Sequence, residues 1–133
     1  MATTVARPKS ERPTDLELEI LKALWQRGPS TVREVKVALS RKRPMLYTTV
    51  LKMLQIMTEK GLVTRDERAR AHVYQARESR RAVSSRLTRD LLQRVFDGST
   101  SQLVLHALEQ RRAKPEELAE IRRLVEEVER RGR

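Results

Sequence analysis

The pattern of apolar residues near the start of the chain predicts an amphipathic helix that begins after Thr14. Apolar side chains recur at the helical spacing of i, i+3 and i+7 in Leu18, Leu21 and Trp25. Thr14 and Glu17 have the spacing of a capping box, in which each side chain binds the backbone N–H of the other. Gly28 is expected to end the helix. Because Trp25 lies in the apolar stripe, we interpret it as a core residue, with base stacking as the alternative.

Two further helices are predicted by the same signals. Thr31 and Glu34 repeat the capping-box pattern, and a short helix follows them. The third helix is predicted over residues 47–60, with Gly61 as the residue that ends it. Its apolar stripe consists of Val50, Met53, Leu54 and Met57. The opposite side of this helix, which we expect to face solvent, carries Thr48, Lys52, Gln55 and Glu59.

A two-stranded hairpin is expected directly after the third helix. Segments 62–65 and 72–76 are predicted as strands, and residues 66–70 as the turn between them. Three arginines crowd this turn, namely Arg65, Arg68 and Arg70. A charged loop is usually a solvated surface, but its place after a polar helix face favours contact with phosphates. A helix, a glycine stop and a basic hairpin in that order are the parts of a winged helix that reads DNA.

From Ser79 onward the chain is predicted to be helical. A long fourth helix breaks at Gly98, a shorter fifth helix follows, and Pro115 suits the first turn of a sixth. The apolar positions expected to form a dimer interface are Val83, Leu87, Leu91, Leu103, Val104, Leu108, Leu118, Ile121, Val125 and Val128. Three helices in a segment this short bury little surface alone. We therefore expect them to associate with a second copy of the chain.

These elements predict a fold that is mainly α with a small β-hairpin, organised in three parts. Residues 1–13 are expected to be a disordered basic arm. Residues 14–77 are expected to form a winged helix–turn–helix domain that binds DNA. Residues 78–133 are expected to form a C-terminal three-helix dimerisation domain.

The charge of the chain favours a polyanionic partner. Its 133 residues include 29 lysines and arginines against 18 acidic residues, a net charge of +11. The excess is concentrated in residues 1–77, which carry +8, whereas residues 78–133 carry +3. The chain has no cysteine, which excludes disulfides and thiolate metal sites, and no cofactor is expected. The sequence contains no signal-like or membrane-spanning apolar run, and we expect a cytoplasmic protein.

The residues expected to contact DNA fall into two groups, those that can reach base edges and those that can reach phosphates. In a winged helix the first turns of the reading helix enter the major groove, where side chains meet base edges. The candidate base-reading residues are Tyr47, Thr48, Thr49 and Lys52. Threonine can hydrogen-bond a base or pack its methyl group on thymine, and lysine can reach guanine or a phosphate. The candidate phosphate-binding residues are Arg41, Lys42, Arg43, Arg65, Arg68 and Arg70.

Several motifs occur in a distinctive order: PTDLELEILKALW, STVREV, YTTVLKMLQIMTEKGLV, the basic hairpin and SQLVLHAL. Together they resemble the penicillinase-repressor family, the BlaI/MecI/CopY type of bacterial transcriptional repressors, over about residues 13–128. The resemblance implies a homodimer that binds a palindromic promoter operator through its winged helix and represses transcription. Because two coupled half-sites bind more tightly than one, we expect release when dimerisation is disrupted. The resemblance also implies operator contacts by Thr48, Thr49 and Lys52, with Arg68 and Arg70 at the wing.

Two departures from the family pattern leave the inducing signal open. Members that control β-lactam resistance are cleaved after an LVL segment, often at Asn-Phe, whereas residues 103–105 are followed here by His106-Ala107. A membrane metallopeptidase sensor, or another protease, is the partner that the resemblance suggests. The copper-responsive relatives carry a C-terminal Cys-x-Cys motif, which this chain lacks.

Other classes of function fit the sequence less well. An enzyme is the least favoured, because His72 and His106 are distant in sequence and have no cysteine or clustered carboxylates beside them. Two such histidines also supply too few ligands for a metal site. A sequence-independent architectural DNA-binding protein would cover the exposed helix face with lysine and arginine, whereas threonines are prominent here. A transcriptional activator shares the features of a repressor, and only the family resemblance favours repression.

Overall fold

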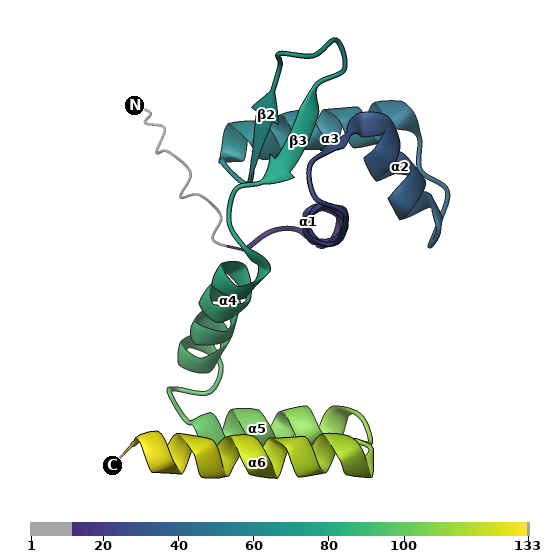
Figure 1. Cartoon of the computed structure of the whole chain (residues 1–133). Coiled ribbons are helices and arrows are strands. Elements are labelled where there is room, and N and C mark those ends of the chain that lie inside the picture. Colours follow the sequence, from purple (N-terminus) through teal and green to yellow (C-terminus); the bar gives the residue numbers. More distant parts are fainter. Residues whose placement is uncertain (1–11, 133) are drawn as a thin grey trace, which may run out of the picture. The chain divides into compact units, whose positions relative to one another are not determined.

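Three helices form the body of the N-terminal part of the chain in the computed structural model, which describes residues 12–132 (Figure 1). They are α1, Asp15–Arg27, α2, Val32–Ser40, and α3, Tyr47–Lys60. Both expected capping boxes are confirmed, between Thr14 and Glu17 at α1 and between Thr31 and Glu34 at α2. These local bonds satisfy backbone N–H groups that a helix start otherwise leaves open, so the helix starts follow directly from the sequence.

The chain divides into two structural units, Met1–Thr88 and Arg89–Arg133. Most of the expected basic arm, residues 1–11, lies outside the described residues. Its last residue, Pro13, is buried and therefore belongs to the folded part of the chain.

Gly61 ends α3 as the sequence predicted. Its φ of 82° and ψ of 16° lie in the left-handed region, which favours glycine. The N–H of Gly61 donates to the carbonyl oxygen of Thr58 at 3.1 Å, and that of Leu62 donates to the carbonyl oxygen of Met57 at 2.9 Å. These bonds close the last turn of the helix and direct the chain into the hairpin.

The sheet contains one strand more than the sequence predicted. The expected hairpin is formed by β2, Val63–Asp66, and β3, Val73–Ala76. A third strand, β1, Ser30–Thr31, pairs antiparallel with β3, so the order is β1-β3-β2. Sequence periodicity did not predict this strand, because a strand of two residues has no periodicity of its own. Asp66, expected in the turn, pairs with Val73 at the end of the ladder.

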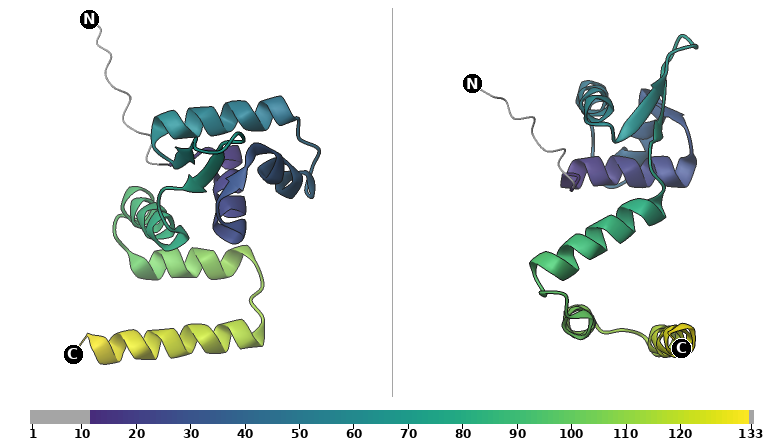
Figure 2. Two further views of the ribbon diagram at one scale, coloured as in Figure 1. Left: turned by 45° about the horizontal axis from the view of Figure 1, so that its top comes forward. Right: turned by 90° about the vertical axis from the view of Figure 1, so that its left-hand side faces the viewer.

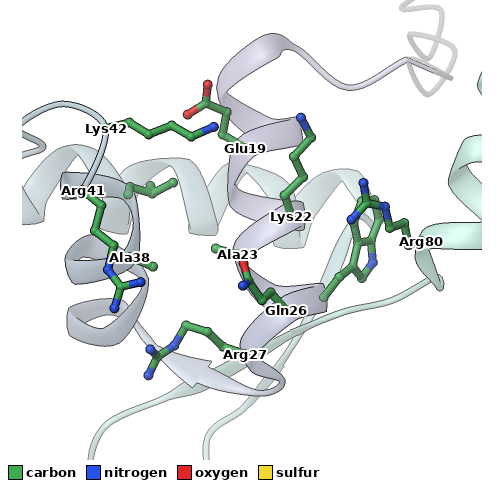
Figure 3. A pocket seen from close by; sticks show the side chains of 11 residues that line it. Glu19, Lys22, Ala23, Gln26, Arg27, Ala38, Arg41, Lys42 and Arg80 are labelled. Atoms are coloured by element: carbon green, nitrogen blue, oxygen red, sulfur yellow. The ribbon is translucent and has the colours of Figure 1, made fainter. Parts of the chain in front are cut away.

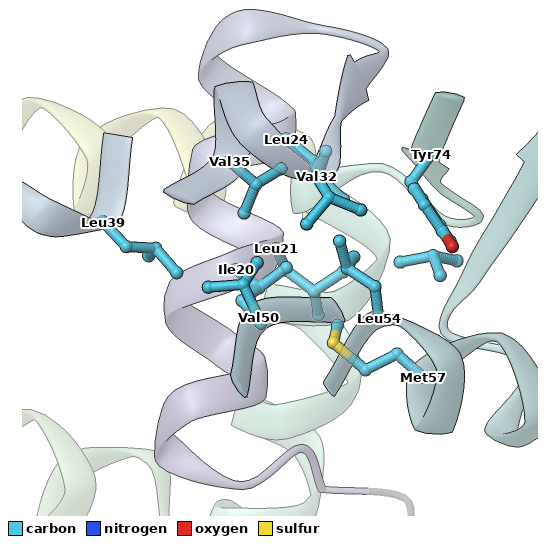
Figure 4. Close-up of a cluster of buried hydrophobic side chains, with 11 residues drawn as sticks. Ile20, Leu21, Leu24, Val32, Val35, Leu39, Val50, Leu54, Met57 and Tyr74 are labelled. Atoms are coloured by element: carbon cyan, nitrogen blue, oxygen red, sulfur yellow. The ribbon is translucent and has the colours of Figure 1, made fainter. Parts of the chain in front are cut away.

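The core of the N-terminal unit lies where the three helices meet the sheet (Figure 4). From α3 it receives Val50, Leu54 and Met57, while Met53 is only partly buried. Tyr74 of β3 is 1% exposed and is the largest fully buried side chain. The other members of the cluster are Ile20, Leu21, Leu24, Val32, Val35, Leu39 and Val63. The helical stripes that the sequence predicted therefore converge on one core.

The start of α4, Arg80–Arg94, is attached to the N-terminal unit. The indole N–H of Trp25 donates to the carbonyl oxygen of Glu78 at 2.9 Å, and Val83 is only 3% exposed. Trp25 is itself partly buried and packs against the core cluster, which confirms its interpretation as a core residue. Its hydrogen bond ties the segment that leads into α4 to the end of α1.

The C-terminal unit continues with α5, Thr100–Gln110, and α6, Pro115–Arg131, which run antiparallel (Figure 2). No residue of either helix is buried. The joint between α4 and α5 covers residues 95–99, where Asp97 and Gly98 have φ of 49° and 83°. Within residues 12–132, no helix is long and apolar enough to cross a membrane.

Candidate nucleic-acid interface

The polar face of α3 is exposed along its length. Thr48, Thr49, Lys52 and Gln55 all face solvent, whereas the apolar stripe of the same helix lies in the core. The N-cap residue, Leu46, makes no side-chain bond to the helix, in contrast to the capping boxes of α1 and α2. The first N–H groups of α3 therefore have no side-chain cap, and the positive end of the helix dipole is available to an anion.

A nearly buried ion pair holds the other end of α3. The ammonium of Lys60 lies 2.7 Å from the carboxylate of Glu17, which is 1% exposed. Burial raises the pKa of Glu17, but the hydrogen bonds from Lys60 and from the backbone N–H of Thr14 outweigh it, and the net pKa is lowered. Glu17 thus caps α1 and, through Lys60, links α1 to the end of α3. This link helps to fix the orientation of α3 relative to α1.

The wing is less positive than its arginines suggest. Arg65 pairs with Glu67 at 2.6 Å, and Arg68 pairs with Asp66 at 2.7 Å. Hydrogen bonds from Arg68 lower the pKa of Asp66 to about 2, so Asp66 is ionised at neutral pH. The sequence analysis counted the arginines without these carboxylates. An anion must therefore displace exposed ion pairs to reach Arg65 or Arg68, and such pairs are weak.

A cleft of about 420 Å³ lies between the wing, which is the β2–β3 hairpin, and the starts of α2 and α3. Arg33 of α2, Tyr47 of α3, and Arg70 and His72 of the hairpin share its lining. Arg33 and His72 were missing from the sequence-predicted contacts. Arg33 is distant from Arg70 in sequence and shares a cleft with it only in the folded unit, whereas His72 was assigned to a strand and not to the arginine-rich turn. Neither Arg33 nor Arg70 makes an ion pair within the described part of the chain. Two guanidinium groups and an imidazole at one cleft can bind a phosphate.

The basic connector between α2 and α3 is exposed, but it does not line this cleft. Arg41 and Lys42 instead line a second cleft together with α1 (Figure 3). Arg43 is exposed and lines neither cleft. The six predicted phosphate-binding residues are thus divided between separate places on the N-terminal unit.

The apolar positions predicted for dimerisation differ in their exposure. Val83 is buried within its own chain, so it is unavailable to a partner, and its assignment to the interface is corrected. Leu87, Leu103, Leu118 and Ile121 are half-buried. The others are exposed, with Val125 at 54% and Val128 at 63% the most open; this group also contains Leu91, Val104 and Leu108. Among the described residues, no group of three or more metal-binding side chains could hold an ion.

Comparison with known proteins decides the family. The family model of the penicillinase repressor matches residues 13–127, most of the chain. The chain belongs to the penicillinase repressor family. Family members are transcriptional repressors, which agrees with the expectation that the chain is not an enzyme.

Named relatives in this family cover nearly the same length. A "Transcriptional regulator BlaI" of Mycobacterium tuberculosis is 37% identical over 123 residues, which is 91% of this chain and 88% of the relative. A "Penicillinase repressor" of Bacillus licheniformis is 26% identical over 114 residues, covering 86% of this chain and 89% of the relative. The similarity therefore extends over both units of the chain and is not confined to the winged helix.

Proposed function

We propose that the chain is a homodimeric bacterial transcriptional repressor that binds a palindromic promoter operator through its winged helix. Family membership and the names of the relatives support repression. The observation that carries the DNA-binding part is the exposed polar face of α3, which begins at an uncapped helix start beside a cationic cleft. In this proposal residues 14–77 bind DNA, and the dimer interface lies within residues 78–133.

Base reading is assigned to the first turns of α3. Thr48, Thr49 and Lys52 would meet base edges in the major groove, and Tyr47 would lie at the groove edge. This face has no arginine for a bidentate contact with guanine, so direct readout is modest. Recognition then depends on the simultaneous binding of two half-sites and on the shape of the DNA between them.

Phosphate contacts are assigned mainly to the cleft between the wing and the helix starts. Arg33, Arg70 and His72 would bind one stretch of backbone, with Arg43 at the connector as a further contact. Arg65 and Arg68 would join them after exchanging their carboxylate partners for phosphates. An architectural protein would need a denser unpaired positive surface than this wing provides, because its binding energy comes from phosphates alone.

Dimerisation is assigned to the exposed and half-buried apolar side chains of the C-terminal helices. α5 and α6 bury no residue in the single chain, and apolar surface of this kind is stabilised when a second copy covers it. The proposed interface consists of Leu87, Leu91, Leu103, Val104, Leu108, Leu118, Ile121, Val125 and Val128.

Release of the operator is assigned to loss of dimerisation. Residues 103–107, at the family cleavage position, lie inside α5, so cleavage there requires local unfolding of that helix. The joint at residues 95–99 lies between α4 and α5 and not inside either, and its Asp97 and Gly98 are exposed. A membrane metallopeptidase sensor or another protease that cut at either place would uncouple the two winged helices.

Selection from a library of random duplexes tests the proposal. The full chain should enrich a sequence with two inverted half-sites spaced by about one helical turn or a multiple of it. A library that shows no sequence preference after selection would instead support an architectural protein.

A further inference from the structure

A second cleft lies on a different part of the N-terminal unit, between α1 and the end of α2. Its volume is about 870 Å³, and its lining comes from α1, α2, the connector after α2 and Arg80 at the start of α4. None of the lining residues belongs to α3 or to the hairpin. The proposed DNA-reading elements therefore leave this cleft unassigned.

Positive side chains dominate the cleft. Its lining contains five cations, Lys22, Arg27, Arg41, Lys42 and Arg80, and a single carboxylate, that of Glu19. Figure 3 shows Lys42 reaching from the end of α2 toward α1, while the guanidinium groups of Arg41, beside α2, and of Arg27, on α1, face the same space. Like charges gathered in this way repel one another unless an anion lies between them.

These cations have few partners in the protein. Within residues 12–132, Arg27 is the only one that forms an ion pair, with Glu34 at 3.9 Å. The other four make none there, not even with Glu19. Several arginines elsewhere, such as Arg86 and Arg123, are held by carboxylates. The negative C-terminal ends of α1 and α2 stabilise the cations that lie near them. They do not stabilise Lys22, in the middle of α1, or Arg80, at the start of α4, to the same extent.

Trp25 adds a flat apolar wall to the cleft. Its ring is held in place by the hydrogen bond from the indole N–H to the carbonyl oxygen of Glu78, and it lines the cleft with Ala23, Ala38 and Leu39. A cleft that combines unpaired cations with an aromatic side chain suits an anion with an organic body better than a bare ion.

We propose that this cleft binds a small organic polyanion, a molecule that carries at least two phosphate or carboxylate groups on a compact or planar body. Arg41 and Lys42 hold its charged groups from the α2 side, and Lys22 and Arg80 hold them from the other. The bound molecule joins α1 and α2 to the first residue of α4, the helix that leads into the C-terminal unit. The site is separate from the proposed DNA-binding function.

The chain contains a single tryptophan, and it lies at this site, so its fluorescence reports on binding directly. The full chain is titrated without DNA, at constant ionic strength, with ATP, pyrophosphate and citrate, and is excited where adenine does not absorb. We expect a saturable fluorescence change with at least one probe. Comparing the affinities for ATP and pyrophosphate with that for citrate shows whether the cleft prefers phosphate or carboxylate groups. Comparing ATP with pyrophosphate shows whether the adenosine part of ATP contributes to binding.

Matched charge removals locate the binding. The double variant Arg41→Ala/Lys42→Ala should weaken the affinity by at least about tenfold, because two charge-assisted contacts are lost. The control Arg122→Ala/Arg130→Ala removes the same charge from α6, outside the cleft, and should leave the affinity within about twofold. Circular dichroism verifies that each variant is folded.

Two results would overturn the proposal. The first is the absence of a saturable change with all three probes. If Arg41→Ala/Lys42→Ala then weakens binding to duplex DNA, these cations belong to the DNA interface instead. The second is equal weakening in both double variants, which would reduce the effect to net charge. Since the anion titrations contain no DNA, a failure of the proposed operator binding would leave their outcome unchanged.

Discussion

At the scale of single residues, the charge of the N-terminal unit is governed by which side chains have partners. Arg65 and Arg68 are paired within the wing, whereas Arg33, Lys52 and Arg70 make no ion pair in the described part of the chain. The cations available to DNA are therefore a subset of those visible in the sequence. Glu17 is the opposite case, a buried acid whose charge is satisfied by the helix it caps and by Lys60.

Replacing Glu17 by Gln should lower the free energy of unfolding by about 1–3 kcal/mol at neutral pH, because Lys60 loses its charged partner. The pKa of Glu17 lies below its ordinary value of 4.5 in the folded chain. Its ionised form therefore stabilises the fold above about pH 4.5, and this stabilisation is lost as the pH falls through the folded-state pKa.

Urea unfolding of the Glu17 variant as a function of pH checks this prediction. The difference from the unmodified chain should shrink below pH 4.5. Glu59→Gln is the control, since Glu59 is exposed on α3 and makes no ion pair within residues 12–132, and it should leave the stability nearly unchanged. A Glu17 variant as stable as the control at neutral pH would contradict the anchoring role.

Thr49→Ala and Arg70→Ala should have different effects on DNA binding. Loss of a base contact at Thr49 should weaken the selected operator more than random duplex, by about 1–2 kcal/mol per half-site. Loss of a phosphate contact at Arg70 should weaken both duplexes alike and reduce the salt dependence by about one ion per half-site. Fluorescence anisotropy at several salt concentrations measures both. Equal effects of Thr49→Ala on the two duplexes would remove Thr49 from base reading.

At the scale of elements, local signals made most of the fold predictable. Capping boxes and glycine stops depend on residues three or four apart, and they placed α1, α2 and α3 correctly. The features that were missed depend on distant segments. β1 exists because β3 pairs with it, and Val83 is buried because the start of α4 is attached to the N-terminal unit. The grouping of Arg33 with Arg70 and His72 likewise requires the folded hairpin.

The attachment of α4 predicts where the winged helix can be truncated. A fragment of residues 1–97 should fold, because it keeps the Trp25–Glu78 hydrogen bond and buried Val83. A fragment of residues 1–77 loses both and should be less stable by about 2–3 kcal/mol. Thermal unfolding of the two fragments measures the difference. Val83→Ala in the longer fragment should reproduce part of the loss, and equal melting temperatures of the two fragments would refute the attachment.

At the scale of the whole molecule, the two units differ in how much apolar surface they bury on their own. The N-terminal unit has a continuous core, whereas α5 and α6 bury no side chain. A helical pair without a core is marginal in water. The sequence already indicated that α6 needs a partner surface, because the apolar residues at positions 118, 121, 125 and 128 form a continuous stripe on one face of the helix. It could not indicate which of the apolar residues the chain would bury on its own.

Dimerisation should depend on the exposed end of α6. Light scattering at micromolar concentration should report about twice the chain mass of 15.5 kDa. Val125→Glu/Val128→Glu should shift the population toward monomers, because charges are placed in an apolar interface. Val37→Glu is the control, since Val37 is an exposed valine of α2 with 52% exposure, and it should leave the mass unchanged. A folded monomer of the unmodified chain would exclude the interface.

The central claim is that the C-terminal helices couple two winged helices on one operator. Its most direct test compares the affinity for a duplex with two half-sites against that for a duplex with one, in the full chain and in Val125→Glu/Val128→Glu. Linking two binding modules raises the effective concentration of the second. The full chain should therefore prefer two half-sites by at least about tenfold, and the variant should lose most of that preference. A full chain that binds both duplexes with equal affinity would contradict the account.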